Sequence, residues 1–67
     1  MAAKKLTKFE QGWIACLATT VNGHGINTGE IEAWRIIGEP TGKQCLASGM
    51  GDYDAQAMDK LLEWSRG

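Results

Sequence analysis

The chain has 67 residues, of which 43% are hydrophobic and 22% charged, and its formal net charge is −1. This length accommodates one small domain and leaves little scaffold for a large enclosed active site. Seven basic residues are outnumbered by eight acids, which argues against the strongly basic surface that nucleic-acid binding normally requires.

A helix over residues 7–22 is predicted by its first turn and by the spacing of its apolar residues. Thr7 and Glu10 have the three-residue separation of a capping box, in which each side chain bonds the other residue's backbone N–H. Asn22-Gly23 then tolerates the left-handed conformation that ends a helix. The apolar positions between them share one helical face and comprise Phe9, Trp13, Ile14, Cys16, Leu17 and Val21.

A second helix is predicted over 28–37. Asn27 and Glu30 form a less regular capping box, flanked by Ile26 and Ile31 at the positions of a hydrophobic staple. Gly38 and the following proline end the helix. Its buried side is expected to hold Ile31, Trp34, Ile36 and Ile37, and its solvent side Glu30, Glu32 and Arg35.

Two further helices are predicted, over 41–48 and 52–65. Thr41 and Gln44 repeat the capping-box spacing, and Gly49 is placed to terminate the short helix. Gly51 or Asp52 caps the last helix, whose first turn is acidic, as the positive end of a helix dipole favours. The apolar positions of that helix are Tyr53, Ala57, Met58, Leu61, Leu62 and Trp64.

The sequence therefore predicts an all-α fold, a compact bundle of about four short helices forming a single domain over 1–67, with residues 1–6 flexible. The expected core consists of Phe9, Trp13, Ile14, Leu17, Val21, Ile26, Ile31, Trp34, Ile37, Leu46, Met58, Leu61 and Leu62.

Neither a metal site nor a membrane-spanning helix is expected. Cys16 and Cys45 are too far apart for a CxxC motif and His24 is the only histidine, so a zinc site would need carboxylates to complete its shell. No secretory leader is expected, and both thiols are expected to be reduced and to lie in or beside the core. The longest apolar run, Trp13 to Ala18, is far too short for a membrane span. We expect a cytoplasmic protein without a cofactor or metal.

Enzymatic motifs are also incomplete. The Gly23-His24-Gly25 segment lacks the Lys-Ser/Thr pair of a phosphate-binding loop and is interpreted as a reversal between helices, with a solvent-facing histidine. Asp52 and Asp54 begin no complete calcium loop, because the sixth position of such a loop would be Ala57 rather than glycine. The chain is therefore expected not to be an enzyme.

Tryptophan is the residue type in excess, with three in the chain. Trp13 and Trp34 fit core faces, whereas Trp64 falls near the end of the last helix. It is either a lid over the core or an exposed binding hot spot beside acidic side chains. The candidate protein-binding residues are Trp64, Glu30, Glu32, Asp54, Asp59 and Glu63.

The segments Phe9-x-x-Gly12-Trp13-Ile14-Ala15, Trp34-Arg35-Ile36-Ile37-Gly38 and Gly51-Asp52-Tyr53-Asp54, with His24-Gly25 and Leu61-Leu62, resemble small helical proteins encoded by phages and prophages. This resemblance implies an inhibitor of a host defence, such as a CRISPR effector, or of a regulatory complex, which acts by stoichiometric binding.

The resulting hypothesis is a non-enzymatic interaction protein that covers a functional surface of a host protein or complex. Its acids would oppose a basic surface of that partner. The alternative is a small DNA-binding transcriptional regulator that uses Lys4, Lys5 and Lys8 with Arg35. A third possibility is a subunit that forms a homodimer through Trp64 and the last helix.

Overall fold

The computed structural model describes residues 5–66, and these form helices without any strand. The four helices are α1 (Lys8–His24), α2 (Thr28–Ile36), α3 (Gly42–Ala47) and α4 (Asp52–Ser65). The predicted all-α fold is confirmed. Residues 1–4, which belong to the segment predicted to be flexible, lie outside the described residues.

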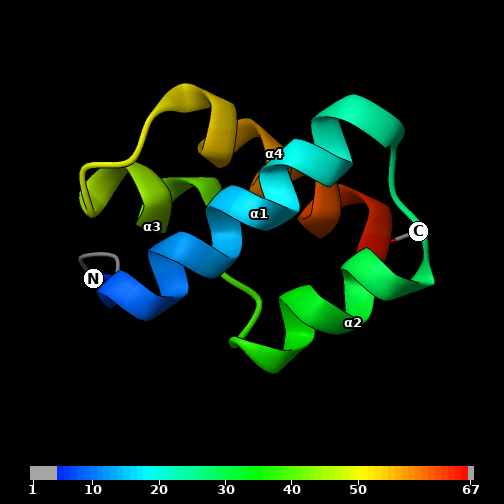
Figure 1. The fold of residues 1–67 in the computed structure, drawn as a ribbon, viewed down its shortest axis with the longest axis horizontal. Coiled ribbons are helices and arrows are strands. Elements are labelled where there is room, and N and C mark those ends of the chain that lie inside the picture. The colour runs from blue at the N-terminus through cyan, green and yellow to red at the C-terminus, as the bar shows by residue number, and fades with distance from the viewer. Residues whose placement is uncertain (1–4, 67) are drawn as a thin grey trace.

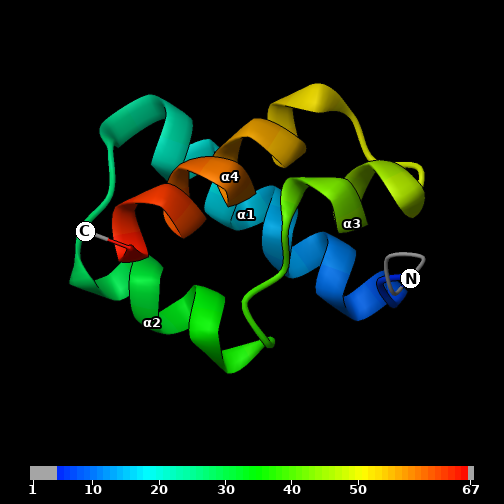
Figure 2. The same ribbon diagram turned by 180° about the vertical axis from the view of Figure 1, so that it is seen from behind.

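Helices α1 and α4 lie at the centre of the bundle, with α3 and α2 toward its two ends (Figure 1, Figure 2). Both α1 and α3 pack extensively on α4, whereas α2 packs mainly on α1. The N-terminal end of α1 lies on the same side of the bundle as α3, and the C-terminal end of α4 lies on the side where α2 begins (Figure 1). The loop between α1 and α2 therefore comes close to the last turn of α4.

Local hydrogen bonds start α1 and α3 as the sequence predicts. The Thr7 hydroxyl accepts the Glu10 backbone N–H at 3.1 Å, and the Glu10 carboxylate accepts the Thr7 N–H at 2.8 Å. Thr41 and Gln44 make the same reciprocal pair at 3.2 and 2.9 Å. These two of the three predicted capping boxes are confirmed, and they satisfy N–H groups that the first turn of a helix leaves without partners.

The termination of α3 is also confirmed. Gly49 has a φ of 88°, and the N–H of Met50 bonds the Cys45 carbonyl at 2.9 Å. The N–H of Gly49 bonds the Leu46 carbonyl at 3.1 Å, so the two bonds form a Schellman motif.

The junction between α1 and α2 differs from its prediction. Helix α1 continues to His24 and stops at Gly25, whose φ of 98° suits glycine and whose N–H bonds the carbonyls of the preceding turn. The predicted capping box at Asn27 is wrong. The Asn27 side chain accepts the Gly29 N–H at 2.9 Å, and Glu30 is turned into the protein.

The buried core contains most of the predicted residues. Its buried hydrophobic side chains include Ile14, Leu17, Val21, Ile31, Trp34, Met58 and Leu61, with Trp13, Ile26, Ile37 and Leu62 partly buried against them. The sequence analysis missed Leu6, Ala18 and Ala55, because small or pre-helical residues carry little periodic signal, whereas Ala57 is buried at one of the apolar positions expected for the last helix. Cys45 is buried, as expected.

Four residues at the expected apolar positions are exposed, so the predicted burial of Phe9, Ile36 and Leu46 is wrong. Phe9, Ile36, Leu46 and Tyr53 are each more than half exposed. Phe9 projects because the 9 residues of α2 span only about 13 Å, whereas the 17 residues of α1 span about 25 Å. The shorter helix therefore covers only part of the apolar stripe on α1. Ile36 lies about 200° around α2 from the buried Trp34, so it faces solvent.

Candidate protein-binding surface

Trp64 lies in the last turns of α4 and is 54% exposed. It lines an open groove of about 400 Å³ together with Val21, Gly25, Ile26, Lys60 and Glu63. We call this set of residues the Trp64 groove. The sequence left open whether this tryptophan covers the core as a lid or is exposed, and an exposed fraction of more than half for the residue favours the second.

Hydrogen bonds between α1 and α4 hold one wall of the groove in place. The Asn22 amide donates to the Tyr53 carbonyl at 3.0 Å, and the Lys60 ammonium donates to the Asn22 side-chain oxygen at 2.9 Å. Gly25 then reverses the chain and brings Ile26 against the core. The Trp64 groove is thus built on residues that the fold already orders, which lowers the entropy cost of binding.

The charge in the groove comes from two side chains of α4. The ammonium of Lys60 is engaged by Asn22, whereas Glu63 is exposed beside Trp64. Within residues 5–66, one ion pair is found, between Arg35 and Glu39 at 3.6 Å, and it lies on α2 and its C-terminal loop. The groove is therefore mainly apolar, with the ammonium of Lys60 and the carboxylate of Glu63 on its lining.

Two of the predicted binding acids lie away from the Trp64 groove, and one of them, Asp59, makes a hydrogen bond within the fold. The Asp59 carboxylate accepts the backbone N–H of Gly42 at 3.0 Å, at the start of α3. Asp54 is partly buried. Burial, with added effects of Asp54 and Asp59, raises the pKa of the Cys45 thiol to about 11. Both acids therefore lie on the α3 side of α4.

The prediction that Glu30 faces outward is wrong. Its exposed fraction is 8%, because it lies one helical turn before the fully buried Trp34 on the same face of α2. A carboxylate in the first turn of a helix is favoured there by the helix dipole. Glu32 is exposed on α2, as expected. Of the six predicted binding residues, the structure brings only Trp64 and Glu63 into one groove.

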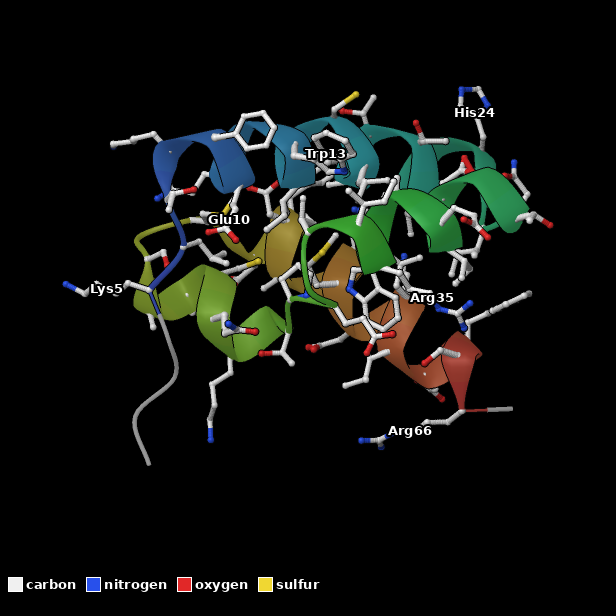
Figure 3. All side chains as sticks on the ribbon, turned by 90° about the horizontal axis from the view of Figure 1, so that it is seen from below. Lys5, Glu10, Trp13, His24, Arg35 and Arg66 are labelled. Atoms are coloured by element: carbon white, nitrogen blue, oxygen red, sulfur yellow. The ribbon has the colours of Figure 1, made fainter. Side chains whose placement is uncertain are left out.

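A second apolar surface was not predicted from the sequence as a binding site. On α1, Phe9, Trp13 and Cys16 follow one another at helical spacing, and Ile36 of α2 is 70% exposed. Trp13 lies between α1 and α2 (Figure 3), where its ring N–H donates to the Ala33 carbonyl at 3.1 Å. The helical spacing was visible in the sequence, but it was assigned to the core. Cys16 in particular is exposed, contrary to its expected place in or beside the core.

The described residues were also searched for a histidine site, a metal site and a membrane-spanning helix. His24 is exposed and projects outward from the end of α1 (Figure 3). In the part of the chain that is described, no three His, Cys, Asp or Glu side chains are grouped to hold a metal ion. None of the described helices is both long and apolar enough to cross a membrane.

The basic residues named for DNA binding do not form one group. Lys5 lies at one end of the molecule and Arg35 well away from it (Figure 3). Arg35 is also paired with Glu39, and Lys4 lies outside the described residues.

Comparisons of the chain with protein-family models, with curated proteins and with solved structures found no match.

Proposed function

We propose that the protein is a non-enzymatic binding module that recognises another protein through the Trp64 groove. The observation that supports this most is the half-exposed Trp64 at the rim of a preformed apolar groove. Tryptophan is among the residues most enriched at binding hot spots, since it buries a large area at low conformational cost.

The chemistry of the groove selects the kind of partner. Helix α4 carries four carboxylates and one lysine, and Glu63 lies at the edge of the groove. A matching partner presents an apolar side chain to the groove and a lysine or arginine to Glu63. The long-range field of α4 would also speed association with a basic surface.

The finer part of the proposal is inhibition by occlusion. The resemblance to phage-encoded helical proteins suggests that the partner belongs to a host defence or regulatory complex, whose functional surface the bound chain covers. Such a role needs stoichiometric binding and no catalysis.

The test combines capture from bacterial lysate with affinity measurement on the purified partner. Nuclease-treated lysate is passed over the tagged wild type and over Trp64→Ala, and the captured protein is then titrated against both. Tyr53→Ala is the matched control, because Tyr53 is equally exposed on the same helix but lies three turns away. We expect Trp64→Ala to weaken binding by roughly 30-fold or more and Glu63→Lys to weaken it further at low salt. Equal losses in Trp64→Ala and Tyr53→Ala would contradict the proposal.

DNA binding is tested with a fluorescent duplex at low salt. Duplex affinity that falls steeply with salt and is lost on replacing Lys5 and Lys8 with alanine would favour the regulator instead.

A further inference from the structure

The Lys60 ammonium in the Trp64 groove is held by a neutral partner. It donates to the Asn22 side-chain oxygen at 2.9 Å, and within residues 5–66 it forms no ion pair with a carboxylate. Lys60 and Glu63 nevertheless both line the groove, and Glu63 follows Lys60 by one turn of α4. Opposite charges at this spacing on a helix ordinarily attract each other. Asn22 thus takes the place that the carboxylate of Glu63 would have beside Lys60.

The Asn22 side chain is fixed so that its oxygen faces Lys60. Its amide nitrogen donates to the Tyr53 carbonyl at 3.0 Å, so both ends of the amide are bonded. Tyr53 lies two turns before Lys60 on α4, or about 10 Å along the helix axis. The Lys60 ammonium is therefore drawn toward the N-terminal end of α4, whereas Glu63 lies toward the C-terminal end.

Glu63 is the acid of α4 that Lys60 would reach if Asn22 did not hold it. The positions one turn before Lys60 are Gln56 and Ala57, which carry no charge. Asp59 lies beside Lys60 in the chain, but its carboxylate is bonded to the start of α3. Helical spacing thus leaves the pair of Lys60 with Glu63 as the alternative to the observed contact.

We propose that Asn22 is a positioning residue of the Trp64 groove, which holds Lys60 away from Glu63 and so leaves the Glu63 carboxylate open to a cation of the partner. The inference rests on the proposed function, which assigns a lysine or arginine of the partner to Glu63. Without Asn22, Lys60 would pair with Glu63 and neutralise the charge that selects this partner. Asn22 therefore determines the specificity of the groove, although it is not one of the lining residues.

The first experiment needs no partner. A carbodiimide joins an amine to a carboxylate in direct contact, with loss of water, and protease digestion with mass spectrometry locates the new amide. Asn22→Ala should raise the yield of the Lys60–Glu63 amide by roughly 2-fold or more over the wild type. Asn22→Asp keeps an acceptor for Lys60, so in this variant the Lys60 amine should couple to the new carboxylate at position 22 instead.

Gln56→Ala is the matched control, because it removes an exposed amide one turn before Lys60 and should couple as the wild type does. Circular dichroism verifies that each variant is folded. Equal yields of the Lys60–Glu63 amide in the wild type and Asn22→Ala would overturn the inference. A folded Asn22→Asp variant that stays uncoupled at position 22 would overturn it as well, since Lys60 would then lie elsewhere.

The second experiment measures the preference of the groove for a cation. The probes are two blocked dipeptides, leucyl-lysine and leucyl-norleucine, which differ in the charged group and are titrated at low salt. The NMR signal of the Glu63 backbone amide reports binding. The wild type should bind the lysine probe roughly 3-fold more tightly than the norleucine probe. Asn22→Ala should lose this preference.

Removal of the competing ammonium separates positioning from a merely structural role. The double variant Asn22→Ala, Lys60→Met should regain the preference for the lysine probe, which a structural role of Asn22 would not produce. An Asn22→Ala variant that keeps the preference of the wild type would overturn the inference. Failure of the proposed function gives a different result, in which Trp64→Ala binds both probes as the wild type does. In that case the carbodiimide yields still decide whether Asn22 holds Lys60 away from Glu63.

Discussion

The Asp59 carboxylate on α4 accepts a hydrogen bond from the backbone N–H of Gly42, the first residue of α3, at 3.0 Å. The first N–H groups of a helix have no partner within the helix and carry partial positive charge, so a carboxylate there is doubly favourable. Helix α3 has only six residues, too few to be stable alone. Asp59 therefore fixes α3 to α4, although it was predicted as a binding residue.

Replacing Asp59 with alanine should destabilise the protein by about 1–2 kcal/mol, because a charge-assisted hydrogen bond and its dipole interaction are lost. Asp59→Asn keeps an acceptor and should lose less. The melting temperature, followed by circular dichroism, should fall by roughly 4–8 °C for each kcal/mol in a domain of this size. Glu63→Ala, another exposed acid of α4, is the control and should change stability by less than about 0.5 kcal/mol. Equal melting temperatures for Asp59→Ala and Glu63→Ala would contradict this role.

The same contact leaves no room for a side chain at Gly42. A Cβ atom there would lie 2.5 and 2.6 Å from the Asp59 carboxylate oxygens and 2.7 Å from the Ala55 carbonyl oxygen. Since the backbone carbonyl cannot rotate away, Gly42→Ala must push α3 off α4 and should cost about 1–3 kcal/mol. Gly12 in α1 has nothing within 4 Å of such a Cβ. Gly12→Ala should instead stabilise the protein by about 0.5–1 kcal/mol through helix propensity. Denaturant midpoints of both variants test this, and a stabilising Gly42→Ala would refute it.

The contrast between capping boxes and the Asp59 contact shows what the sequence could predict. Thr7 and Glu10 act over three residues of one chain segment, so their types and spacing suffice. Asp59 meets Gly42 from 17 residues away, and no local pattern records that meeting. The same holds for Leu6, whose N–H donates to the Ser48 hydroxyl at 2.7 Å across 42 residues.

Helical periodicity likewise predicts an apolar stripe but not how much of the stripe a neighbour covers. Phe9 and Trp13 share one face of α1, yet only Trp13 reaches α2. Glu30 is the opposite case. As an acid it was expected to face solvent, but it is buried because it lies on the same face of α2 as Trp34. Of the residues that line the Trp64 groove, the sequence analysis named only Trp64 and Glu63 as binding residues. The groove also needs Val21 of α1 and Gly25 and Ile26 of the following loop, which only the tertiary fold brings beside the end of α4.

Trp34 is the largest fully buried side chain, and its ring N–H donates to the Pro40 carbonyl at 2.8 Å. This bond joins α2 to the loop that leads into α3. Trp34→Phe removes both the donor and part of the packed volume, so we expect a loss of about 2–4 kcal/mol. Trp64→Phe makes the same chemical change at an exposed position and should cost less than about 1 kcal/mol. Urea unfolding followed by circular dichroism compares the two, and similar midpoints would contradict the assigned role of Trp34.

The buried thiol of Cys45 makes the stability of the fold depend on pH in the alkaline range. Burial, with smaller contributions from Asp54 and Asp59, raises the pKa of its thiol from 9.0 to about 11. Below pH 9 the folded and unfolded chains both keep the proton, so the full contribution of the thiol to stability is present. Between pH 9 and pH 11 the unfolded chain releases the proton while the folded chain holds it, and stability therefore falls as pH rises. We expect the urea midpoint of the wild type to fall more steeply over this interval than that of Cys45→Ala, which lacks the thiol. Cys16→Ala is the control and should keep the steep dependence, because Cys45 is intact. Parallel profiles for the wild type and Cys45→Ala would show that other groups cause the alkaline loss.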